Sequence, residues 1–523
     1  MGGGDSHLPP GIAQTVWRQE KQTYKFPSLK ENISADVVVI GAGIYGMSVA
    51  YCLSKEGKKV VVLEGRSRGS GQTGRTTAHL MMWNDDYYHI VEKQFGAEIM
   101  SRVADSHRTA IDFVENVVET EGISCEFKRV DGYLFPQSDS KEDMEMIDKE
   151  LDAANRAGLK DVCKVDLGGQ RTVGGIREAL LFPGCADFQP LYYLNGLADA
   201  IVNKYGGRIF EHSQVMQTEG KQITTIDGFT VEASNVVLAT NSPIHHNLAI
   251  HSRQEPYRSY VVGLRIPEDE FKEGQYWDTA QPYHYVRHEE HPQGHILIVG
   301  GEDHKTGIKP SEYEDKYKKL EEWARSRWTK AGELVFKWSG QVFEPIDMLH
   351  LIGKDPLNDM QIGGATYYTA TGDSGQGMTG GTLAGMIIAD EILGKENPFA
   401  KIYSPSRAPP VSMNTLEELV SLGITVTKGL GENVNPMYLR DIEDMKPCSG
   451  SVVQKGLQKL AVYVDEHGKK HACSAVCPHM KAVVQWNPNE GTFDCPLHGS
   501  HFDRYGNVIN GPAIANLKPV KLD

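Results

Sequence analysis

A strand, turn, helix and strand near the N-terminus constrain the fold more than any other feature of this chain. The pattern is an apolar run, three glycines spaced as Gly-x-Gly-x-x-Gly, a segment of helical period, and a second apolar run that ends in an acidic residue. Its fixed points are residues 37–40, Gly41, Gly43, Gly46, residues 60–63 and Glu64. The first glycine permits a tight turn, the second lets the backbone approach a pyrophosphate, and the third allows close helix packing. Because the helix N-terminus attracts phosphate and Glu64 can accept from a ribose hydroxyl, the pattern predicts a Rossmann-like α/β domain that binds a dinucleotide.

The length and charge of the chain limit its organisation and its partners. A chain of 523 residues is expected to form two or three domains. Its net charge of −15 comes without a basic cluster, which argues against nucleic acid and against anionic membrane surfaces as partners. No apolar run approaches the roughly 18 residues of a membrane span, and the first residues contain no apolar signal core. We therefore expect no transmembrane segment and a cytoplasmic location.

Two further glycine-rich segments favour FAD as the dinucleotide. The loop after Glu64 contains small or hydroxyl-bearing residues that can run beneath an extended ligand: Gly71, Thr73, Gly74, Thr76 and Thr77. Much later, a strand and a glycine-rich turn precede a long amphipathic helix that begins near Gly377, Met378 and Thr379. The amides of its first turn can face the negative charge that a reduced flavin carries. We find no second strand-GxGxxG-helix pattern for NAD(P)H, so we expect the electrons to come from a substrate.

These segments resemble the D-amino-acid-oxidase and glycine-oxidase family of FAD-dependent oxidoreductases. The resemblance is carried by "VVVIGAGIYGMSVAYCL", "SGQTGRTTAHL", "NVVLATNSP" and "ATGDSGQGMTGG", and it covers roughly residues 14–403. It implies that Gly41, Gly43, Gly46 and Glu64 hold the ADP half of FAD. It also implies that the loop Gly71–Thr77 and the turn Asp373–Thr379 hold the ribityl chain and the isoalloxazine. Three residues are implied to line the adenine end: Val215, Ala239 and Thr240.

The family fold also implies a second, mainly antiparallel sheet inserted over the flavin. Four segments have the short β-rich runs expected of this sheet, at residues 258–267, 284–290, 295–301 and 334–345. Such flavin sites mainly orient the substrate, which is expected to be an amine or amino acid that loses hydride from a carbon bearing nitrogen. Candidate residues for the wall of the catalytic site are His79, Tyr285 and Trp338, with Tyr283 beside them.

Two cysteines and two histidines near the C-terminus form a candidate metal site. They are arranged as Cys477-x-His479 and Cys495-x-x-His498. This set suits either Zn²⁺ or a Rieske [2Fe–2S] cluster, and the spacing alone does not decide between them. A zinc finger would place its histidines together near the end of a helix. Here each histidine is paired with a cysteine in a loop rich in proline and glycine, which favours the cluster.

The segment "CPLHGSHFDRYGNVINGPA", after "QWNPNEGTFD", resembles the Rieske family over about residues 438–523. Many members carry a disulfide between the two cluster loops, at positions that match Ala482 and Leu497 here. Its absence fits a reducing compartment. Ser500 matches a hydroxyl donor to cluster sulfur, whereas Phe502 occupies the position of a tyrosine donor. The resemblance therefore predicts a reduction potential below the top of the roughly −150 to +300 mV Rieske range.

The sequence thus predicts a fold of three parts: a Rossmann-like FAD-binding α/β domain, an inserted antiparallel substrate domain, and a small all-β Rieske domain. The boundaries are an N-terminal extension at 1–34, the FAD-dependent oxidoreductase at 35–404, a proline-rich connector at 405–437 that includes a short helix, and the Rieske domain at 438–523. A Rieske oxygenase would need a large catalytic domain after the cluster, and only residues 499–523 follow His498.

The predicted function is the oxidation of a C–N bond in a small amine or amino-acid-like substrate. Electrons are expected to pass between FAD, the cluster and an external acceptor or donor. The alternative is an electron-transfer reductase that uses both cofactors to serve a separate enzyme. A deep pocket beside the flavin would oppose this alternative.

Overall fold

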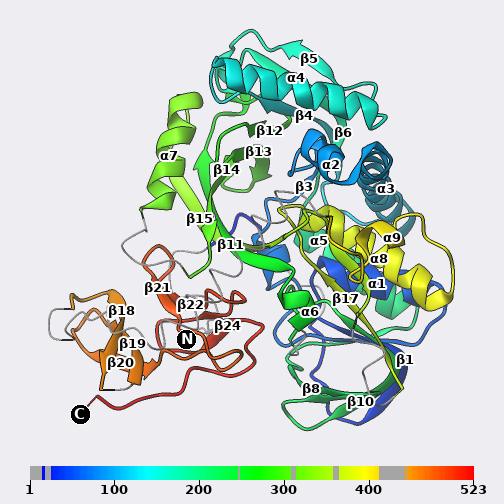
Figure 1. Ribbon diagram of the computed structural model, residues 1–523, viewed down its shortest axis with the longest axis vertical. Coiled ribbons are helices and arrows are strands. Elements are labelled where there is room, and N and C mark those ends of the chain that lie inside the picture. Colours follow the sequence, from blue (N-terminus) through cyan, green and yellow to red (C-terminus); the bar gives the residue numbers. More distant parts are fainter. Residues whose placement is uncertain are drawn as a thin grey trace.

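We describe a computed structural model of the chain (Figure 1). It describes residues 14–17, 25–244, 248–307, 314–356, 364–410, 442, 445–456 and 458–522. The short helix predicted in the connector 405–437 and most of the N-terminal extension lie outside these residues. None of the helices in these ranges is both long enough and apolar enough to cross a membrane.

The first sheet has eight strands and forms the dinucleotide-binding layer. Its order is β16-β17-β10-β1-β2-β7, and the hairpin β8-β9 joins it through β10. The strands are β1 (Ile33–Ile40), β2 (Val60–Leu63), β7 (Arg208–Phe210), β8 (Val215–Glu219), β9 (Gln222–Thr225), β10 (Thr230–Leu238), β16 (Leu351–Lys354) and β17 (Thr366–Thr371). The five strands from β17 to β7 run parallel, which places their carboxyl ends at one edge. The apolar second half of β1 is buried, as expected for a strand covered on both faces.

The second sheet has nine strands in the order β15-β11-β14-β13-β12-β4-β6-β3, with β5 beside β6. The strands are β3 (His79–Leu80), β4 (Lys128–Phe135), β5 (Cys163–Asp166), β6 (Glu178–Asp187), β11 (Gln254–Arg265), β12 (Gln275–Asp278), β13 (His284–His291), β14 (Gly294–Lys305) and β15 (Leu334–Pro345). All of its pairings are antiparallel except that between β4 and β12. The four predicted β segments fall on β11, β13, β14 and β15, and the antiparallel sheet is confirmed.

Helices cover both layers. They are α1 (Ile44–Lys55), α2 (Tyr88–Phe95), α3 (Ala97–Glu121), α4 (Lys141–Arg156), α5 (Pro190–Asp199), α6 (Leu248–His251), α7 (Lys316–Arg327), α8 (Gly377–Leu393) and α9 (Ala400–Tyr403). Glycines on α8 explain its close packing on α1, because a Cβ on Gly381 would lie 2.6 Å from Ile44 Cγ2 and one on Gly385 would lie 2.7 Å from Ser48 Cβ. This packing places the N-termini of the two helices next to each other.

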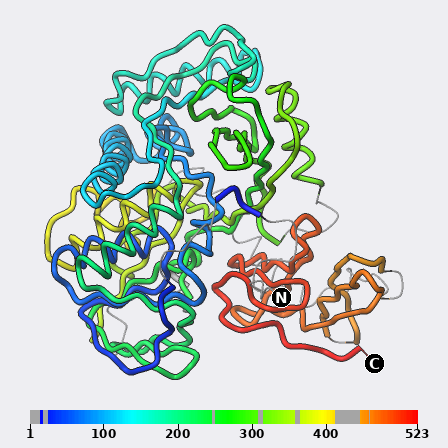
Figure 2. Tube along the Cα trace, turned by 180° about the vertical axis from the view of Figure 1, so that it is seen from behind, coloured from blue at the N-terminus to red at the C-terminus, as the bar shows by residue number. Residues whose placement is uncertain are grey.

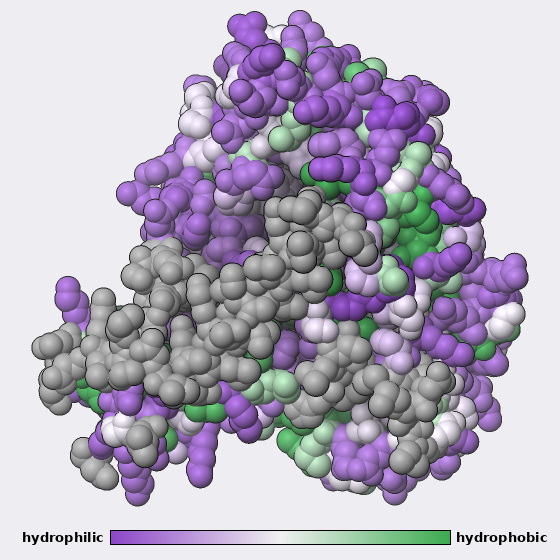
Figure 3. All heavy atoms as spheres, viewed as in Figure 1, coloured by the Kyte–Doolittle hydropathy of each residue, from purple (hydrophilic) through white to green (hydrophobic). Residues whose placement is uncertain are grey.

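The C-terminal domain consists of two small antiparallel sheets. One contains β18 (Ser449–Lys455), β19 (Gln458–Val464) and β20 (Lys470–Ser474); the other contains β21 (Gln485–Asn487), β22 (Thr492–Asp494), β23 (His501–Phe502) and β24 (Val508–Asn510). Both tube and ribbon views show the second of these sheets beside the flavin domain, with the first farther out (Figures 1 and 2). The face of the molecule in Figure 3 is mainly hydrophilic where its described residues are visible. The predicted fold class is confirmed.

Candidate functional site

One cavity of about 930 Å³ joins the three parts of the molecule. It lies at the carboxyl edge of the parallel strands, where Ile40 and Leu63 end β1 and β2. The antiparallel sheet supplies a second wall, and the segment around Asn510 in the C-terminal domain supplies a third. An open α/β sheet binds its ligands at this edge of the strands.

The turn after β1 is too close to its neighbours for a side chain. Gly41 has φ +107°, and a Cβ there would lie 2.3 Å from the carbonyl oxygen of Ala239. A Cβ on Gly46 would lie 1.9 Å from the carbonyl oxygen of Gly41. The turn therefore exposes backbone to the cavity through Gly41 and Gly43, while Gly46 lies behind it.

Backbone amides fix the side chains around this turn. Glu64 accepts hydrogen bonds from Ala42 N at 2.9 Å and from Arg66 N at 2.8 Å, so its carboxylate is held against the cavity. Thr73 Oγ1 accepts from Ile44 N at 2.9 Å, which ties the following loop to the start of α1. These hydrogen bonds hold the turn after β1, the start of α1 and the following loop together at this edge of the cavity.

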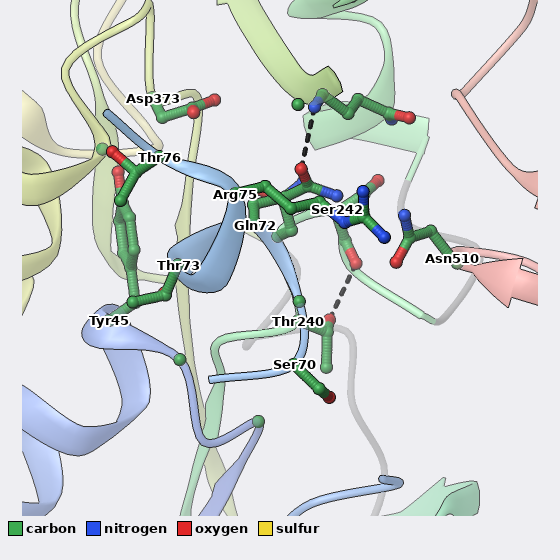
Figure 4. A pocket seen from close by; sticks show the side chains of 18 of the residues that line it. Tyr45, Ser70, Gln72, Thr73, Arg75, Thr76, Thr240, Ser242, Asp373 and Asn510 are labelled. Carbon is green, nitrogen blue, oxygen red and sulfur yellow. Dashed lines mark hydrogen bonds between the residues drawn. The ribbon is translucent and has the colours of Figure 1, made fainter. Parts of the chain in front are cut away.

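The opposite side of the same edge begins α8. Gly377 and Met378 line the cavity at its first turn, beside Asp373. Asp373 accepts from Phe343 N at 2.7 Å, and burial raises the pKa of its carboxyl to about 6. Figure 4 shows Asp373 and Tyr45 at the left, Asn510 at the right, and Gln72 and Arg75 between them.

Most of the predicted cofactor residues line this cavity. They are Gly41, Gly43, Glu64, Gly71, Thr73, Thr76, Thr77, Val215, Ala239, Thr240, Asp373, Gly377 and Met378. Three others stand behind the wall: Gly46, Gly74 and Thr379. A Cβ on Gly74 would lie 2.4 Å from Gly69 O, and Thr379 is 1 % exposed. These last three residues shape the edge through packing.

The structure places two of the three predicted catalytic residues at the cavity and the third behind it. His79 and Tyr285 line the cavity, and their rings meet edge to face at 6.0 Å. Trp338 is fully buried and is not among the lining residues; its indole N–H donates to Arg75 O at 2.8 Å, so it supports the cofactor loop from behind. Buried Trp17 supports the same loop by donating to Thr76 O at 2.6 Å.

Several lining residues were not predicted from the sequence. They are Tyr45, Ser70, Gln72, Arg75, Ser242, Ser259, Trp277, Asp303 and Asn510. Gln72 and Arg75 belong to the same loop as Thr73 and Thr76, so that loop was the available signal. Tyr45 lies inside the first glycine motif, Ser70 directly precedes Gly71, and Ser242 lies in "NVVLATNSP", so these segments were the signal for them. No local pattern marks Ser259, Trp277, Asp303 and Asn510, because they reach the cavity from the antiparallel sheet or from the C-terminal domain.

The four predicted cluster ligands are brought together as two pairs. The thiols of Cys477 and Cys495 interact, and both residues are buried at 0 % and 2 % exposure. This interaction, together with backbone and Ser500 hydrogen bonds, lowers the pKa of the Cys477 thiol to about 7. The rings of His479 and His498 lie 5.1 Å apart. Two adjacent thiols and two adjacent imidazoles fit a Rieske cluster, in which each pair binds one iron.

Within the described residues, no group of three or more histidine, cysteine, aspartate or glutamate side chains is arranged to hold a single metal ion. The two cluster loops are instead held by short backbone contacts, Cys477 N to Ala482 O at 2.9 Å and Cys495 N to Ser500 O at 2.8 Å. Ala482 and Leu497, at the positions of the missing disulfide, are buried in the same apolar core as the two cysteines. In this domain, the packing of Ala482 and Leu497 therefore connects the two cluster loops in place of a disulfide.

The cluster loops pack on the flavin domain. The ring of His251, at the end of α6, lies 5.2 Å from that of His479 and 4.4 Å from that of His498. Nearby, Arg258 of β11 contacts His501, and its guanidinium donates to Ser339 Oγ at 2.5 Å. His251 is 2 % exposed, so this contact is part of a closed interface.

A buried carboxylate completes the interface. Glu490 accepts from Ser339 Oγ at 2.7 Å and from the Tyr317 hydroxyl, and it lies 4.0 Å from Arg258. At the cavity, Arg66 donates to Ile509 O at 2.5 Å. Charged side chains thus join the two domains on both sides: the Arg258–Glu490 pair near the cluster loops, and the Arg66 guanidinium at the cavity.

This fold and these two sites define a flavoprotein fused to an iron–sulfur domain. The chain belongs to the family of FAD dependent oxidoreductases, whose model matches residues 36–391, and the Rieske [2Fe-2S] domain model matches residues 435–521. It is an oxidoreductase with FAD and a Rieske [2Fe–2S] cluster as its cofactors.

Known proteins that are similar to this chain are consistent with these two domain assignments. The putative Rieske 2Fe-2S iron-sulfur protein YhfW of Bacillus subtilis is 29% identical over 99% of this chain and 100% of its own length. The gamma-glutamylputrescine oxidoreductase of Escherichia coli is 24% identical over 72% of this chain and 87% of its own length. Among solved structures, glycine oxidase from Geobacillus kaustophilus has a TM-score of 0.56 and 18% identity, covering 72% of this chain and 99% of that one.

Proposed function

We propose that this protein oxidises a C–N bond of a small amine or amino-acid-like molecule and that electrons pass between FAD, the Rieske cluster and an external acceptor. When bound, FAD supplies a hydride acceptor and the cluster supplies one-electron transfer. The single observation that carries the proposal is the cavity itself. It continues past the dinucleotide residues to His79 and Tyr285, and the Rieske domain forms another of its walls.

Different groups of residues have different roles at this site. Gly41, Gly43 and Glu64 would hold the ADP half at the first helix N-terminus, where backbone N–H groups face phosphate. The first amides of α8, at Gly377 and Met378, would stabilise negative charge on the ring system. Trp338 and Trp17 hold the loop between these two groups by donating to its carbonyl oxygens.

The contact between the domains supports the electron relay. His251 of the flavin domain packs against both candidate ligand histidines, and the buried Arg258–Glu490 pair joins the same two domains. Removing either charge would leave the other buried without its partner, which is strongly destabilising. The interface therefore favours a docked position for the cluster loops over a free one.

The alternative function is an electron-transfer reductase that oxidises no metabolite itself. Such a protein needs an exposed edge of the flavin but no enclosed space beside it. The aromatic and polar side chains of Trp277, Tyr285 and Asp303 line a space that none of the dinucleotide motifs accounts for. This observation favours substrate oxidation.

The test is an anaerobic titration of the protein that contains both cofactors. A panel of amines and amino acids is added while visible absorbance and EPR spectra are recorded, and dithionite is added last. We expect one class of compound to bleach the flavin and then produce the signal of a reduced Rieske cluster. If no compound bleaches the flavin while dithionite still reduces the cluster, the electron-transfer alternative is favoured.

A further inference from the structure

The end of the cavity that lies against the antiparallel sheet is lined by a separate group of residues. Its lining residues come from β3, β11, β12, β13 and β14 and from the segment before β13: His79, Ser259, Trp277, Tyr283, Tyr285 and Asp303. Apart from His79, which stands near the end of "SGQTGRTTAHL", none of them belongs to the glycine-rich motifs of the dinucleotide site. They are therefore the residues available to a substrate.

A bulge in the sheet directs Asp303 to this position. The pairing of β11 with β14 shifts between Arg258 and Tyr260, where Glu302 has φ +58°. Such a bulge leaves an extra residue outside the regular ladder and re-aims its side chain. Asp303 follows Glu302 in the chain, and the Asp303 carboxylate lies next to the Ser259 hydroxyl. The Ser259 hydroxyl also lies 2.7 Å from the Tyr285 hydroxyl.

One oxygen of Asp303 is left for a ligand. Asp303 Oδ1 is buried and forms no hydrogen bond to any residue within the described ranges. The nearby basic side chains are engaged elsewhere: His284 Nδ1 lies 2.8 Å from Asp278, and Lys316 Nζ lies 3.1 Å from Glu302. Neither side chain lines the cavity. Burial raises the pKa of Asp303 to about 6, so the carboxylate is mainly ionised above that pH.

A second buried polar atom at this end also lacks a partner in the described part of the chain. It is Nε2 of His79, a residue that is 9 % exposed and whose Nδ1 meets Thr77 Oγ1 at 2.9 Å. Burial lowers the pKa of His79 to about 3, so the imidazole is neutral and adds no positive charge. The end thus offers a ligand one carboxylate oxygen, one neutral imidazole and aromatic rings.

The cationic side chains of the cavity lie at its other end. Among the described residues, the arginines that line it are Arg66 and Arg75, and no lysine does so. Arg66 donates to Ile509 O of the Rieske domain, and Arg75 donates to Ser339 O at 3.3 Å. Arg287, on the antiparallel sheet, donates to Thr77 O and pairs with Glu289, so it is committed behind the cofactor loop. Among the described residues, a substrate carboxylate would therefore find no lysine or arginine side chain lining this end of the cavity.

We infer that this end of the cavity binds a cationic amine through an ion pair with Asp303, and that the bound ammonium is a second positive group, apart from the nitrogen that is oxidised. The inference rests on the proposed function and names the substrate class of that site. The oxidised nitrogen needs its lone pair free, whereas a carboxylate holds nitrogen in its protonated form. The rings of Tyr283 and Tyr285, 5.6 Å apart, add cation–π attraction for the same group.

The test measures binding rather than turnover. n-Butylamine and butyrate, which match in shape and differ in charge, are titrated at pH 8 into the oxidised holoprotein while the visible band of the flavin is followed. We expect n-butylamine to bind and butyrate to bind at least tenfold more weakly. Asp303→Asn should weaken n-butylamine by about 10- to 100-fold, the usual loss for a hydrogen bond to a charged group. Glu302→Gln is the matched control, because Glu302 lies next in the chain and pairs with Lys316 outside the cavity.

Two outcomes would overturn the inference: butyrate binding as tightly as n-butylamine to the unaltered protein, or an unchanged n-butylamine affinity in Asp303→Asn that still contains FAD. The first does not depend on how the variant folds. Failure of the proposed function is separate, since it would leave n-butylamine bound through Asp303 while no amine, including 1,4-diaminobutane, bleached the flavin.

Discussion

The two cofactor sites of this protein are built by opposite means. The cluster site takes its four candidate ligands from two loops between residues 477 and 498, and it depends on the atoms of those side chains. The flavin cavity takes its lining from residues between Ile40 and Asn516 and depends largely on backbone that glycines leave accessible. A side-chain deletion should therefore damage the first site most, and an added methyl group should damage the second most.

The largest effect is expected for Cys495→Ser. Removing one of two adjacent thiols should abolish the EPR signal of the reduced cluster, because the iron loses a thiolate ligand. The flavin absorbance should remain, since no cavity residue changes. Cys473→Ser is the matched control: Cys473 is also buried in this domain, and its thiol donates to Ala461 O. Equal loss of the signal in both variants would contradict the assignment of ligands.

The converse experiment is Gly41→Ala. The new Cβ would lie 2.3 Å from Ala239 O, in a backbone conformation with φ +107°, so the turn must move. We expect loss of most bound FAD and a decrease of more than about 2 kcal/mol in the free energy of unfolding. The cluster signal should persist in protein that remains folded.

Gly57→Ala provides the control for backbone conformation. Gly57 also has positive φ, +78°, but a Cβ added there would have no other atom within 4 Å. The substitution should cost only about 1–2 kcal/mol for the left-handed conformation and should leave FAD content unchanged. FAD content that falls equally in both glycine variants would show that close approach at Gly41 is not the cause.

The same contrast explains how much could be predicted from the sequence. The glycine motif predicted the dinucleotide-binding strands because only glycine leaves the backbone clearance that this turn needs. The second sheet was implied by the family resemblance, and its short β-rich runs matched that expectation. Asp303 could not be predicted, because a bulge directs it. Nor could the approach of Asn510 and His251 across the interface, which is a property of domain packing.

Trp338 illustrates the limit of a strand pattern. Side chains two residues apart in a strand share a face, so Trp338, Gly340 and Val342 lie on the same face of β15 and the strand pattern does not say which of them reaches the ligand. The structure has Trp338 against Arg75 O, while Gly340, Gln341 and Val342 of the same strand line the cavity. The bulky residue supports the loop, and smaller neighbours form the wall.

A substitution at the interface between the flavin and Rieske domains tests how the two cofactor sites are connected, because it changes no residue of either site. Arg258→Met removes a cation that is 3 % exposed and leaves Glu490 buried without it. We expect the free energy of unfolding to fall by about 3–5 kcal/mol. Electron transfer between flavin and cluster should also slow, measured by rapid mixing with dithionite and freezing for EPR.

Arg265→Met is the control for this variant, because Arg265 lies on the same strand and pairs with exposed Glu333 at 3.3 Å. Its cost should be below about 1 kcal/mol. If Arg258→Met behaves like Arg265→Met in both measurements, the buried pair does not hold the two domains together.

The smallest expected effect is a change in reduction potential from Ser500→Ala. The Ser500 hydroxyl interacts with Cys477, and its oxygen accepts from Ala513 N at 3.0 Å, which directs the hydroxyl hydrogen away from that amide. A donor to sulfur stabilises the more negative, reduced cluster, so its removal should lower the potential. For a hydrogen bond of roughly 1.5–3 kcal/mol, the shift is roughly 60–130 mV for one electron. A redox titration followed by EPR measures it, with Ser449→Ala as the control, whose hydroxyl bonds only to Lys446 O among the described residues. An unchanged potential in Ser500→Ala would mean that packing around Ala482 and Leu497, rather than this hydroxyl, sets the potential of the cluster.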